Sequence, residues 1–325
     1  MKTILISIIT LLFFIGCGAS KQKEVSLPTW YLNPPANNPI FIFGEGMGDT
    51  LDDAKANALN NMAAKLVVAV SSSIKSYTAT YSNGNASSYD KSITKQVQTD
   101  VEKIKFNNAK VEKSLMAGKN FIVLMKVDRE ELYRLKKQEF LDLDSRIDSK
   151  YNNASTFPQL EKIYALQSLQ KKINEAKSKS YIVNAIKNSF QSHTYISKYD
   201  SYIDEIATLK TITPIYVQSN MDENYFKDEL ITLLNTEQFK VSNDKNSPIL
   251  IDLNNKVRYS IARGWNIAKV TNTVTVKSNN KTISNNVIQS LGRSSSSKEN
   301  ALNSAAIDFS KKLKKHGVEK ILFSK

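Results

Sequence analysis

The stretch that decides the fold of the first domain is Phe41–Leu59, FIFGEGMGDTLDDAKANAL. Its apolar start, Phe41–Phe43, predicts a short strand that ends in the glycine-rich segment Gly44–Gly48. Asp49 or Thr50 can then cap a helix, and the two acidic residues of the first turn favour the positive end of the helix dipole. The stretch therefore predicts a strand that passes directly into a helix.

The helix has an apolar face rich in small residues, which would let it lie close on a sheet. This face consists of Leu51, Ala54, Ala58 and Met62. The preceding glycines have GxGxG spacing, not the GxGxxG of a dinucleotide loop, and Glu45 and Asp49 would repel a pyrophosphate. We therefore expect no cofactor here, and interpret the glycines as supplying positive φ and close backbone approach.

The chain after this helix alternates between strand-like and helical patterns. We expect β structure from Val67 to Tyr81, and a hairpin of two strands, about 104–115 and 121–127, around Ala117–Asn120. Residues 128–210 carry apolar side chains at steps of three and four, with an interruption near 152–158, and predict amphipathic helices. These helices could pack within the protein, or could form a projecting hairpin that spaces two domains or makes an oligomer seam.

The C-terminal part has alternating apolar and polar residues that predict a mostly antiparallel sheet with helices on one side. The fold class is thus α+β: two small domains of antiparallel sheet plus helix, joined by a helical region. We expect five parts in chain order: a lipoprotein signal peptide at 1–16, a lipidated Cys with a flexible tether at 17–29, an α+β domain at 30–130, a helical spacer at 131–210 and a C-terminal α+β domain at 211–325.

The N-terminus has the pattern of an export signal. One basic residue precedes the apolar run Ile4–Ile15, which as a helix would rise roughly 18 Å, short of the ~30 Å hydrocarbon core of a bilayer. The run ends at Phe14-Ile15-Gly16-Cys17, which resembles a bacterial lipobox. In such signals the Cys receives diacylglycerol, the bond before it is cut and the new amine is acylated, so Cys17 is our predicted lipidation site, carrying palmitate-type chains.

Lipidation at Cys17 would fix the compartment of the protein. Gly18 follows the Cys in place of Asp, which by resemblance to known sorting signals predicts the outer membrane, facing the periplasm or the cell surface. Cys17 is the single cysteine of the chain, so the expected cell-envelope location brings no intrachain disulfide.

Short motifs in the first domain resemble the LPP20 lipoprotein family over residues 28 to about 130. They are Pro28-Thr29-Trp30 after the Cys, Gly44-Glu45-Gly46, Asp53-Ala54 with Ala58 and Ala63-Ala64, and the segment Val67–Ser73, expected as a strand. The resemblance implies an outer-membrane or surface lipoprotein without known enzymatic activity, and some similar members belong to motility-associated assemblies. The terminal domain also resembles the periplasmic αβ modules of other envelope lipoproteins, which are typically assembly or activation adaptors.

The composition argues against a nucleic-acid partner. The 325 residues contain 45 Lys+Arg against 31 Asp+Glu, a net charge of +14, but only six of the basic residues are arginine. Paired donors that read phosphate and guanine favour arginine, and no domain-length basic stripe with interleaved aromatics stands out. We interpret the excess as solvated lysines, with attraction to anionic envelope polymers or lipid headgroups as the alternative.

No catalytic or metal constellation is evident, and the chain shows no small-molecule substrate site. The residues considered have structural interpretations: helix-terminal or surface histidines (His193, His316), a loop and helix cap (Ser294–Ser297), solvated carboxylates (Asp142/Asp144, Glu130/Glu131) and core-anchoring tryptophans (Trp30, Trp265). We therefore predict a non-enzymatic structural or interaction module with an envelope protein partner or self-association. The alternatives are a binding module for peptidoglycan or lipopolysaccharide, and a periplasmic hydrolase whose groups converge only in three dimensions.

Overall fold

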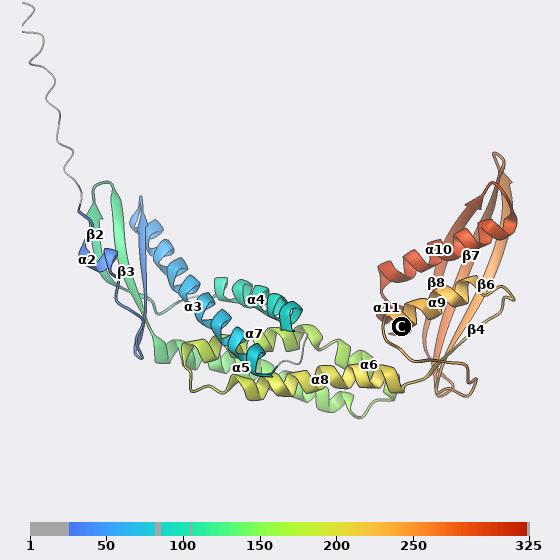
Figure 1. The fold of residues 1–325 in the computed structure, drawn as a ribbon, viewed down its shortest axis with the longest axis horizontal. Helices are drawn as coiled ribbons and strands as arrows, with labels where there is room; N and C mark the ends of the chain where they lie inside the picture. The colour runs from blue at the N-terminus through green and yellow to red at the C-terminus, as the bar shows by residue number, and fades with distance from the viewer. Residues whose placement is uncertain (1–25, 82–85, 105, 324–325) are drawn as a thin grey trace, which may run out of the picture. The chain divides into compact units, whose positions relative to one another are not determined.

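The protein is described by a computed structural model covering residues 26–81, 86–104 and 106–323 (Figure 1). Contacts divide the chain into two compact units. The first contains the described residues up to Leu66 together with Glu102–Leu132, and the second contains Val67–Val101 and Tyr133 onward. The fold is α+β, as the sequence predicts.

The first unit is a three-stranded antiparallel sheet covered by a helix, with strand order β1-β3-β2. The predicted hairpin is confirmed, and Gly118 takes a φ of +67° at its turn. The strands are β1 (Phe41–Gly48), β2 (Lys110–Ala117) and β3 (Asn120–Asp128), and the helices are α2 (Thr29–Leu32) and the first part of α3 (Leu51–Tyr81).

Three alternate glycines of β1 bring the strand against α3. A Cβ added to Gly46 would lie 2.2 Å from the carbonyl oxygen of Ala54 and 2.3 Å from the backbone nitrogen of Ala58. A Cβ added to Gly44 would lie 2.2 Å from the carbonyl oxygen of Ala58, and Gly48 is similarly close to Ala54. The predicted close approach is confirmed, whereas the predicted positive φ is not found at these strand glycines.

Helix α3 is longer than the sequence analysis predicts. The β-branched segment after Val67 continues the helix to Tyr81, so the expected β structure at 67–81 is wrong. A buried residue recurs every fourth position along the helix and extends the same apolar face: Ala54, Ala58, Met62, Leu66, Val70 and Ile74. Burial of this face outweighs the modest helix penalty of the valines.

The second unit contains the predicted helical region. The helices of the predicted region are α5 (Arg129–Ala154), whose first turn belongs to the first unit, α6 (Gln159–Gln167), α7 (Gln170–Ile186) and α8 (Ser192–Ile212). They are preceded by α4 (Ala86–Glu102), which lies outside the predicted region. The expected break near 152–158 is confirmed, since α5 ends at Ala154 and α6 begins after Pro158. Buried side chains of α5–α8 belong to the same hydrophobic cluster as those of the C-terminal sheet, which favours packing within the protein over a projecting hairpin.

A five-stranded sheet completes the second unit, in the order β5-β4-β6-β7-β8. Helices α9 and α10 lie on one face of it (Figure 1). The sheet is mixed, not purely antiparallel, because β4 runs parallel to both of its neighbours. The elements are β4 (Ile215–Ser219), α9 (Tyr225–Thr236), β5 (Val241–Ser242), β6 (Ile249–Ala262), β7 (Trp265–Ser278), β8 (Lys281–Ser294), α10 (Lys298–His316) and α11 (Val318–Phe323).

Helix α10 contacts the edge strand β8 through both shape and polar bonds. A Cβ added to Gly292 would lie 1.9 Å from the carbonyl oxygen of Ala301 and 2.3 Å from the backbone nitrogen of Ala305. The backbone N–H of Leu291 donates to Oδ2 of Asp308 at 2.8 Å. Lys312 Nζ donates to the backbone oxygen of Gln289 at 2.8 Å and also pairs with Asp308.

Candidate functional site

The predicted lipidation site, Cys17, lies outside the described residues, as does the rest of the lipobox-like segment. Among the described helices, none is long and apolar enough to cross a membrane. The same part of the chain contains no cluster of three or more His, Cys, Asp or Glu that could hold a metal ion. Two features of the second unit bring functional side chains together: a cavity and a polar network.

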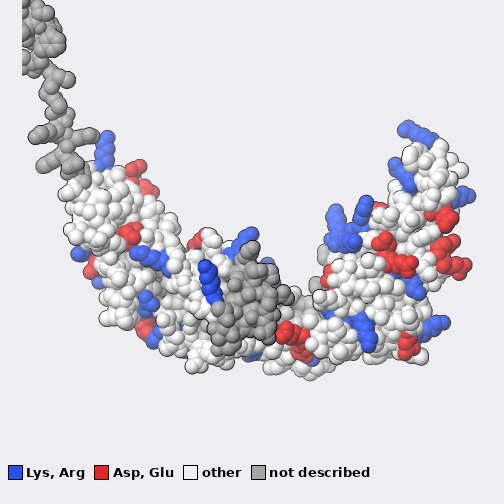
Figure 2. All heavy atoms as spheres, viewed as in Figure 1, with Lys and Arg blue, Asp and Glu red and all other residues white. Residues whose placement is uncertain are grey.

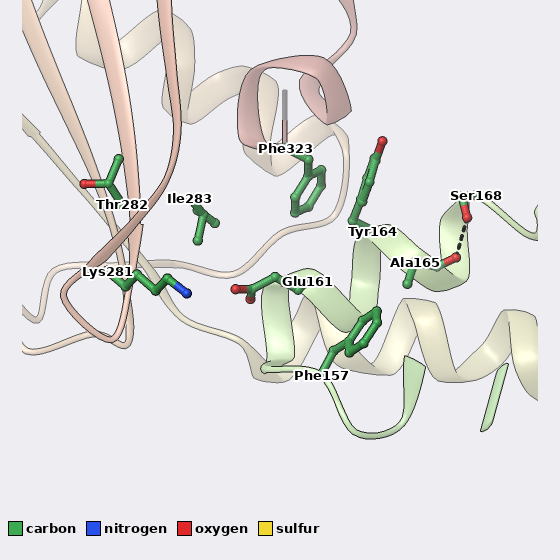
Figure 3. A pocket seen from close by; sticks show the side chains of 9 residues that line it. All are labelled: Phe157, Glu161, Tyr164, Ala165, Ser168, Lys281, Thr282, Ile283 and Phe323. Carbon is green, nitrogen blue, oxygen red and sulfur yellow. Dashed lines mark hydrogen bonds between the residues drawn. The ribbon is translucent and has the colours of Figure 1, made fainter. Parts of the chain in front are cut away.

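The cavity has a volume of about 500 Å³ and lies between α6, the start of β8 and the end of α11 (Figure 3). One wall of the cavity is a single face of α6 and its flanking residues. This face includes Phe157, Glu161, Tyr164 and Ser168, which are spaced three or four positions apart. The opposite face of α6 carries the buried core residues of the helix. The face with Glu161 and Tyr164 is therefore the one that lines the cavity. Lys281 and its neighbours in β8 supply the other wall.

Aromatic side chains form the apolar part of the cavity. The rings of Tyr164 and Phe323 stack with centroids 4.6 Å apart and an interplanar angle of 28°. Tyr164 is 45% exposed and Phe157 is 40% exposed, so both present ring surface to solvent. Aromatic faces of this kind give a ligand large contact area at a small cost in side-chain entropy.

Two opposite charges complete the lining. Oε2 of Glu161 is buried and has no hydrogen-bond partner among the described residues. Lys281 points toward Glu161 across the cavity in Figure 3, but the two form no ion pair within the described chain. A buried carboxylate oxygen without a partner is costly, so a donor that enters the cavity would gain from pairing with it.

The cavity is thus suited to binding an amphipathic group with an apolar ring or stem and a hydrogen-bond donor. The hydroxyl of Ser168 donates to the backbone oxygen of Ala165 at 2.6 Å and is held by that bond. Sequence analysis missed this site because its walls come from segments more than 110 positions apart. The one local signal was the helical spacing of Phe157, Glu161 and Tyr164.

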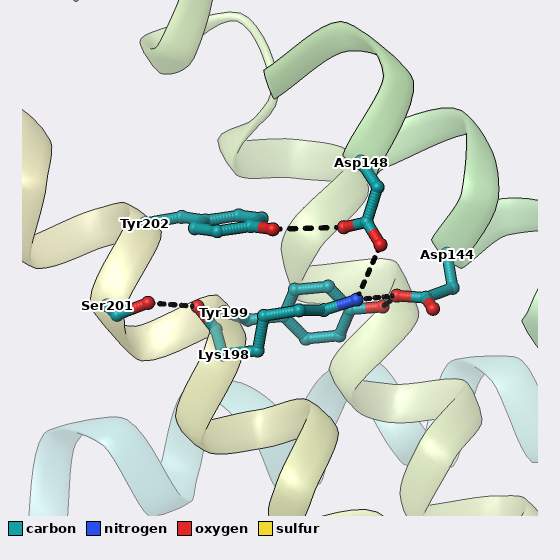
Figure 4. A network of polar contacts seen from close by, with 6 residues as sticks. All are labelled: Asp144, Asp148, Lys198, Tyr199, Ser201 and Tyr202. Atoms are coloured by element: carbon teal, nitrogen blue, oxygen red, sulfur yellow. Dashed lines mark hydrogen bonds and ion pairs between the residues drawn. The ribbon is translucent and has the colours of Figure 1, made fainter. Parts of the chain in front are cut away.

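The polar network joins α5 to α8 (Figure 4). The ammonium of Lys198 contacts Asp144 and lies 2.9 Å from Oδ2 of Asp148. The hydroxyl of Tyr199 donates to Asp144 at 2.6 Å, and that of Tyr202 donates to Asp148 at 3.0 Å. Asp144 is therefore largely buried and paired, which corrects the expectation of a solvated carboxylate, whereas Asp142 is exposed as expected.

The network extends along α8 to a third acidic residue, Glu205. Glu205 accepts hydrogen bonds from Tyr151 and Lys162, and the Tyr151 ring stacks on Tyr202 at 3.7 Å. Burial and the bond to Glu205 raise the pKa of Tyr151 to about 12. Although burial alone would raise the pKa of Glu205, the contacts with Lys162 and Tyr151 lower it below its ordinary value.

The electrostatics of the network favour a structural role. Burial, followed by the hydrogen bond and charge of Asp144, raises the pKa of Tyr199, and burial with Asp148 does the same for Tyr202. Burial alone would lower the pKa of Lys198, but its bonds to Asp144 and Asp148 raise it. The tyrosines stay protonated and the lysine stays charged near neutral pH, so the network acts as a fixed clamp and not as a proton carrier.

The remaining sequence-predicted residues have the following places. His193 is exposed in the first turn of α8, and His316 ends α10, as expected for helix-terminal residues. Ser297 caps α10, since its hydroxyl accepts the backbone N–H of Asn300 at 3.0 Å. Trp265 is 48% exposed at the β6–β7 turn, so its expected role as a core anchor is wrong.

Charges are mixed over much of the surface that Figure 2 shows. Acidic and basic side chains both occur on each unit, and uncharged surface lies around them. Several lysines are engaged in ion pairs, including Lys65 with Glu45 at 2.8 Å. This distribution supports the interpretation of the overall basic excess as largely solvated or paired lysines.

Comparison with known proteins identifies the first part of the chain. A minor lipoprotein from Acinetobacter baumannii is 11% identical, with a TM-score of 0.27 over 32% of this chain and 89% of that one. The secreted protein HP1454 from Helicobacter pylori is 14% identical, with a TM-score of 0.40 over 72% of this chain and 82% of that one. No curated protein matches the sequence. The family model of the LPP20 lipoproteins matches residues 28–128, and this part of the chain is therefore an LPP20 lipoprotein family domain.

Proposed function

We propose that this protein is a membrane-anchored envelope lipoprotein that works as a non-enzymatic interaction module. The observation that carries the proposal is the position of Cys17, which follows an apolar export-like run and a small residue and lies eleven positions before the LPP20 match begins. A lipoprotein family domain directly after a lipobox-like cysteine is the order expected for an acylated, exported chain.

The energetics of such an anchor favour permanent attachment. Each buried methylene contributes about 0.8 kcal/mol, and a single acyl chain alone gives only marginal binding. Three chains on one cysteine would make dissociation negligible, so no membrane-spanning helix is needed. Gly18 in place of Asp favours the outer membrane as the site of the anchor.

Two observations support an interaction role over catalysis. LPP20 is a lipoprotein family and not a known enzyme family. The carboxylates of the α5–α8 network are all held by lysine and tyrosine partners, and the cavity lining offers an aromatic and charged surface for contact. We propose that the partner is another envelope protein or a second copy of this chain.

The anchor is tested with Cys17→Ser, and with Ser20→Ala as the matched control outside the lipobox. Cells are labelled with palmitate, and the protein is followed through membrane fractionation. We expect label and membrane association for the wild type and for S20A, and neither for C17S. Palmitate incorporation and membrane association of C17S would overturn the anchor.

The interaction role is tested separately by crosslinking in cells followed by mass spectrometry. We expect crosslinks from surface residues of the two units to an envelope protein, or between two copies of the chain. A strictly monomeric protein with no crosslinked partner would contradict the interaction role and leave the anchor result unaffected.

A further inference from the structure

The C-terminal sheet contains a long acid-free segment. Between Asp252 and Glu299 lie 46 residues without Asp or Glu, and they include eight Lys or Arg. Three of the six arginines of the whole chain, Arg258, Arg263 and Arg293, fall within this segment. The segment coincides with β6, β7 and β8, so its charge is displayed on a single meander.

Strand register places the charges on the sheet face that the helices leave bare. Arg258 pairs with Lys269 across β6 and β7, and Lys269 pairs with Leu291 on β8. The next row, which ends at Gly292, faces α10, because Gly292 lies against Ala301. Side chains alternate between faces, so Arg258 and Lys269 project from the opposite face, and Arg293 does so beside them.

These cations have no acidic partner on their own face. Arg258, Lys269 and Arg293 are exposed and form no ion pair among the described residues. Like charges directly opposite each other on neighbouring strands are destabilising. The nearest acidic residue of β6 on this face, Asp252, is six positions from Arg258, about 20 Å along the strand.

The acidic groups near the meander lie toward its other face or at its outer edge. Glu223 lies near Tyr259, whose row faces the helices. Asp308 lies at the outer edge of β8 and pairs with Lys312. An anion from outside the chain is therefore the group that would relieve the repulsion between Arg258 and Lys269.

The same end of the sheet exposes apolar and aromatic side chains. Trp265 is 48% exposed on the bare face, and Ile261 is 72% exposed at the adjoining end of β6. Arg263 and Gly264 form the turn between them, both with positive φ. Blue side chains gather around this tip in Figure 2. Tryptophan with neighbouring cations is the combination found where proteins meet lipid headgroups.

We propose that this basic hairpin face, defined by Arg258, Lys269, Arg293 and Trp265, docks onto a bilayer that carries anionic phospholipid headgroups. The cations pair with headgroup phosphates while Trp265 enters the interfacial layer. The inference goes beyond the proposed anchor, because it uses only residues of the second unit and does not require Cys17.

The test uses the full chain with Trp30→Phe, which leaves Trp265 as the single tryptophan. The protein is mixed with vesicles of phosphatidylcholine alone, or of phosphatidylcholine with phosphatidylglycerol, both containing brominated lipid that quenches tryptophan within the bilayer. We expect quenching of Trp265 only with phosphatidylglycerol. The quenching should disappear between about 0.1 M and about 1 M salt, because the screening length falls from ~10 Å to ~3 Å.

Charge variants in this background identify the surface. R258Q/K269Q/R293Q should weaken docking about a hundredfold, since each cation near an anionic surface contributes about fivefold. The matched control K311Q/K314Q/K315Q removes the same charge from exposed positions of α10 and should change docking little. If the triple variant fails to fold by circular dichroism, R258Q alone should still weaken docking about fivefold.

Several results would overturn the proposal. Equal quenching in both vesicle types would show attraction without headgroup charge, and equal losses in the two triple variants would show a net-charge effect. Binding to dissolved polyphosphate with no quenching in vesicles would assign the face to an anionic polymer. Quenching of Trp265 in a Cys17→Ser chain would support lipid docking even where palmitate labelling contradicts the anchor, so the two proposals fail independently.

Discussion

The two units contain the same strand-to-helix contact, built on three glycines in the first unit and on one in the second. In the first, Gly46 of edge strand β1 lies against Ala54 and Ala58 of α3. In the second, Gly292 of edge strand β8 lies against Ala301 and Ala305 of α10. In both, the alanines are four positions apart and the missing side chain leaves room for helix backbone.

The difference lies in the number of glycine contacts along each strand. Strand β1 repeats glycine at every second position, so α3 lies close along three successive contacts, and Asn57 and Lys65 of α3 donate to backbone oxygens of the strand at 2.8 and 3.2 Å. Strand β8 has Gly292 alone, between Ser290 and Ser294 on the same face, and α10 adds polar bonds from Asp308 and Lys312. Both contacts therefore combine fit with hydrogen bonding, and they differ in how many glycines the strand contributes.

The largest expected effect is that of Gly46→Val. Its side chain would meet helix backbone at about 2.2 Å, and backbone cannot yield as a side-chain end can. We expect a loss of about 4 kcal/mol or more in the unfolding free energy of the first unit. Urea unfolding, with hydrogen exchange of peptides from β1 and α3, measures it. Ala56→Val, at an exposed position of α3, should cost little, and equal effects of the two changes would contradict the model.

Gly292→Val tests the second contact in the same way. We expect a loss of about 3 kcal/mol, smaller than for Gly46→Val, because a shift of α10 disturbs one glycine contact, whereas a shift of α3 also disturbs those at Gly44 and Gly48. Hydrogen exchange should rise in peptides of α10 and stay unchanged in those of β1. Ala262→Val, exposed on β6, serves as the control. Unchanged protection of α10 in G292V would show that its contact with the strand is not tight.

Lys198→Met measures how much the ion pairs between α5 and α8 contribute to stability, for comparison with the glycine contacts. It leaves Asp144 and Asp148 without their cation in a partly buried site, and we expect a loss of about 2 kcal/mol. Lys171→Met, exposed on α7, is the control and should be close to neutral. The measurement is thermal unfolding. A K198M protein as stable as wild type would show that the tyrosines alone hold the two helices.

The smallest effects are expected at the two helix caps. The hydroxyl of Thr50 accepts the N–H of Asp53 at 3.1 Å and donates to its carboxylate at 2.6 Å, whereas Ser297 makes the backbone bond to Asn300. We expect Thr50→Ala to cost about 1.5 kcal/mol and Ser297→Ala about 1 kcal/mol. Urea unfolding midpoints with Ser295→Ala as a control check this order, and the reverse order would assign the stronger cap to α10.

Much of the fold follows from local patterns in the sequence. Features that depend on neighbours within a few residues could be predicted. They are the glycine segment, the Thr50 cap, the hairpin at Gly118 and the helical region. The segment after Val67 was mispredicted because β-branched residues favour strands locally. The four-residue spacing of its apolar positions continues from Ala54 and indicates a helix.

The candidate site was harder to predict from the sequence than the fold, for a physical reason. The cavity requires Lys281 and Phe323 to meet α6, and no local spacing reports contacts of that sequence separation. Asp144 was expected to be solvated because nothing in α5 reveals that Lys198 and Tyr199 lie opposite it. Trp265 was expected in the core because hydrophobicity alone does not show where a hairpin ends.

The bonds from α10 to the outer edge of β8 have a consequence for self-association. A fourteen-residue border strand with open amide groups would be a template for a second copy to add a strand and start a fibre. Asp308 and Lys312 occupy backbone groups of that border at Leu291 and Gln289. These two bonds block the addition of a strand along the part of the border from Gln289 to Leu291, so two copies would have to pair outside this part of β8.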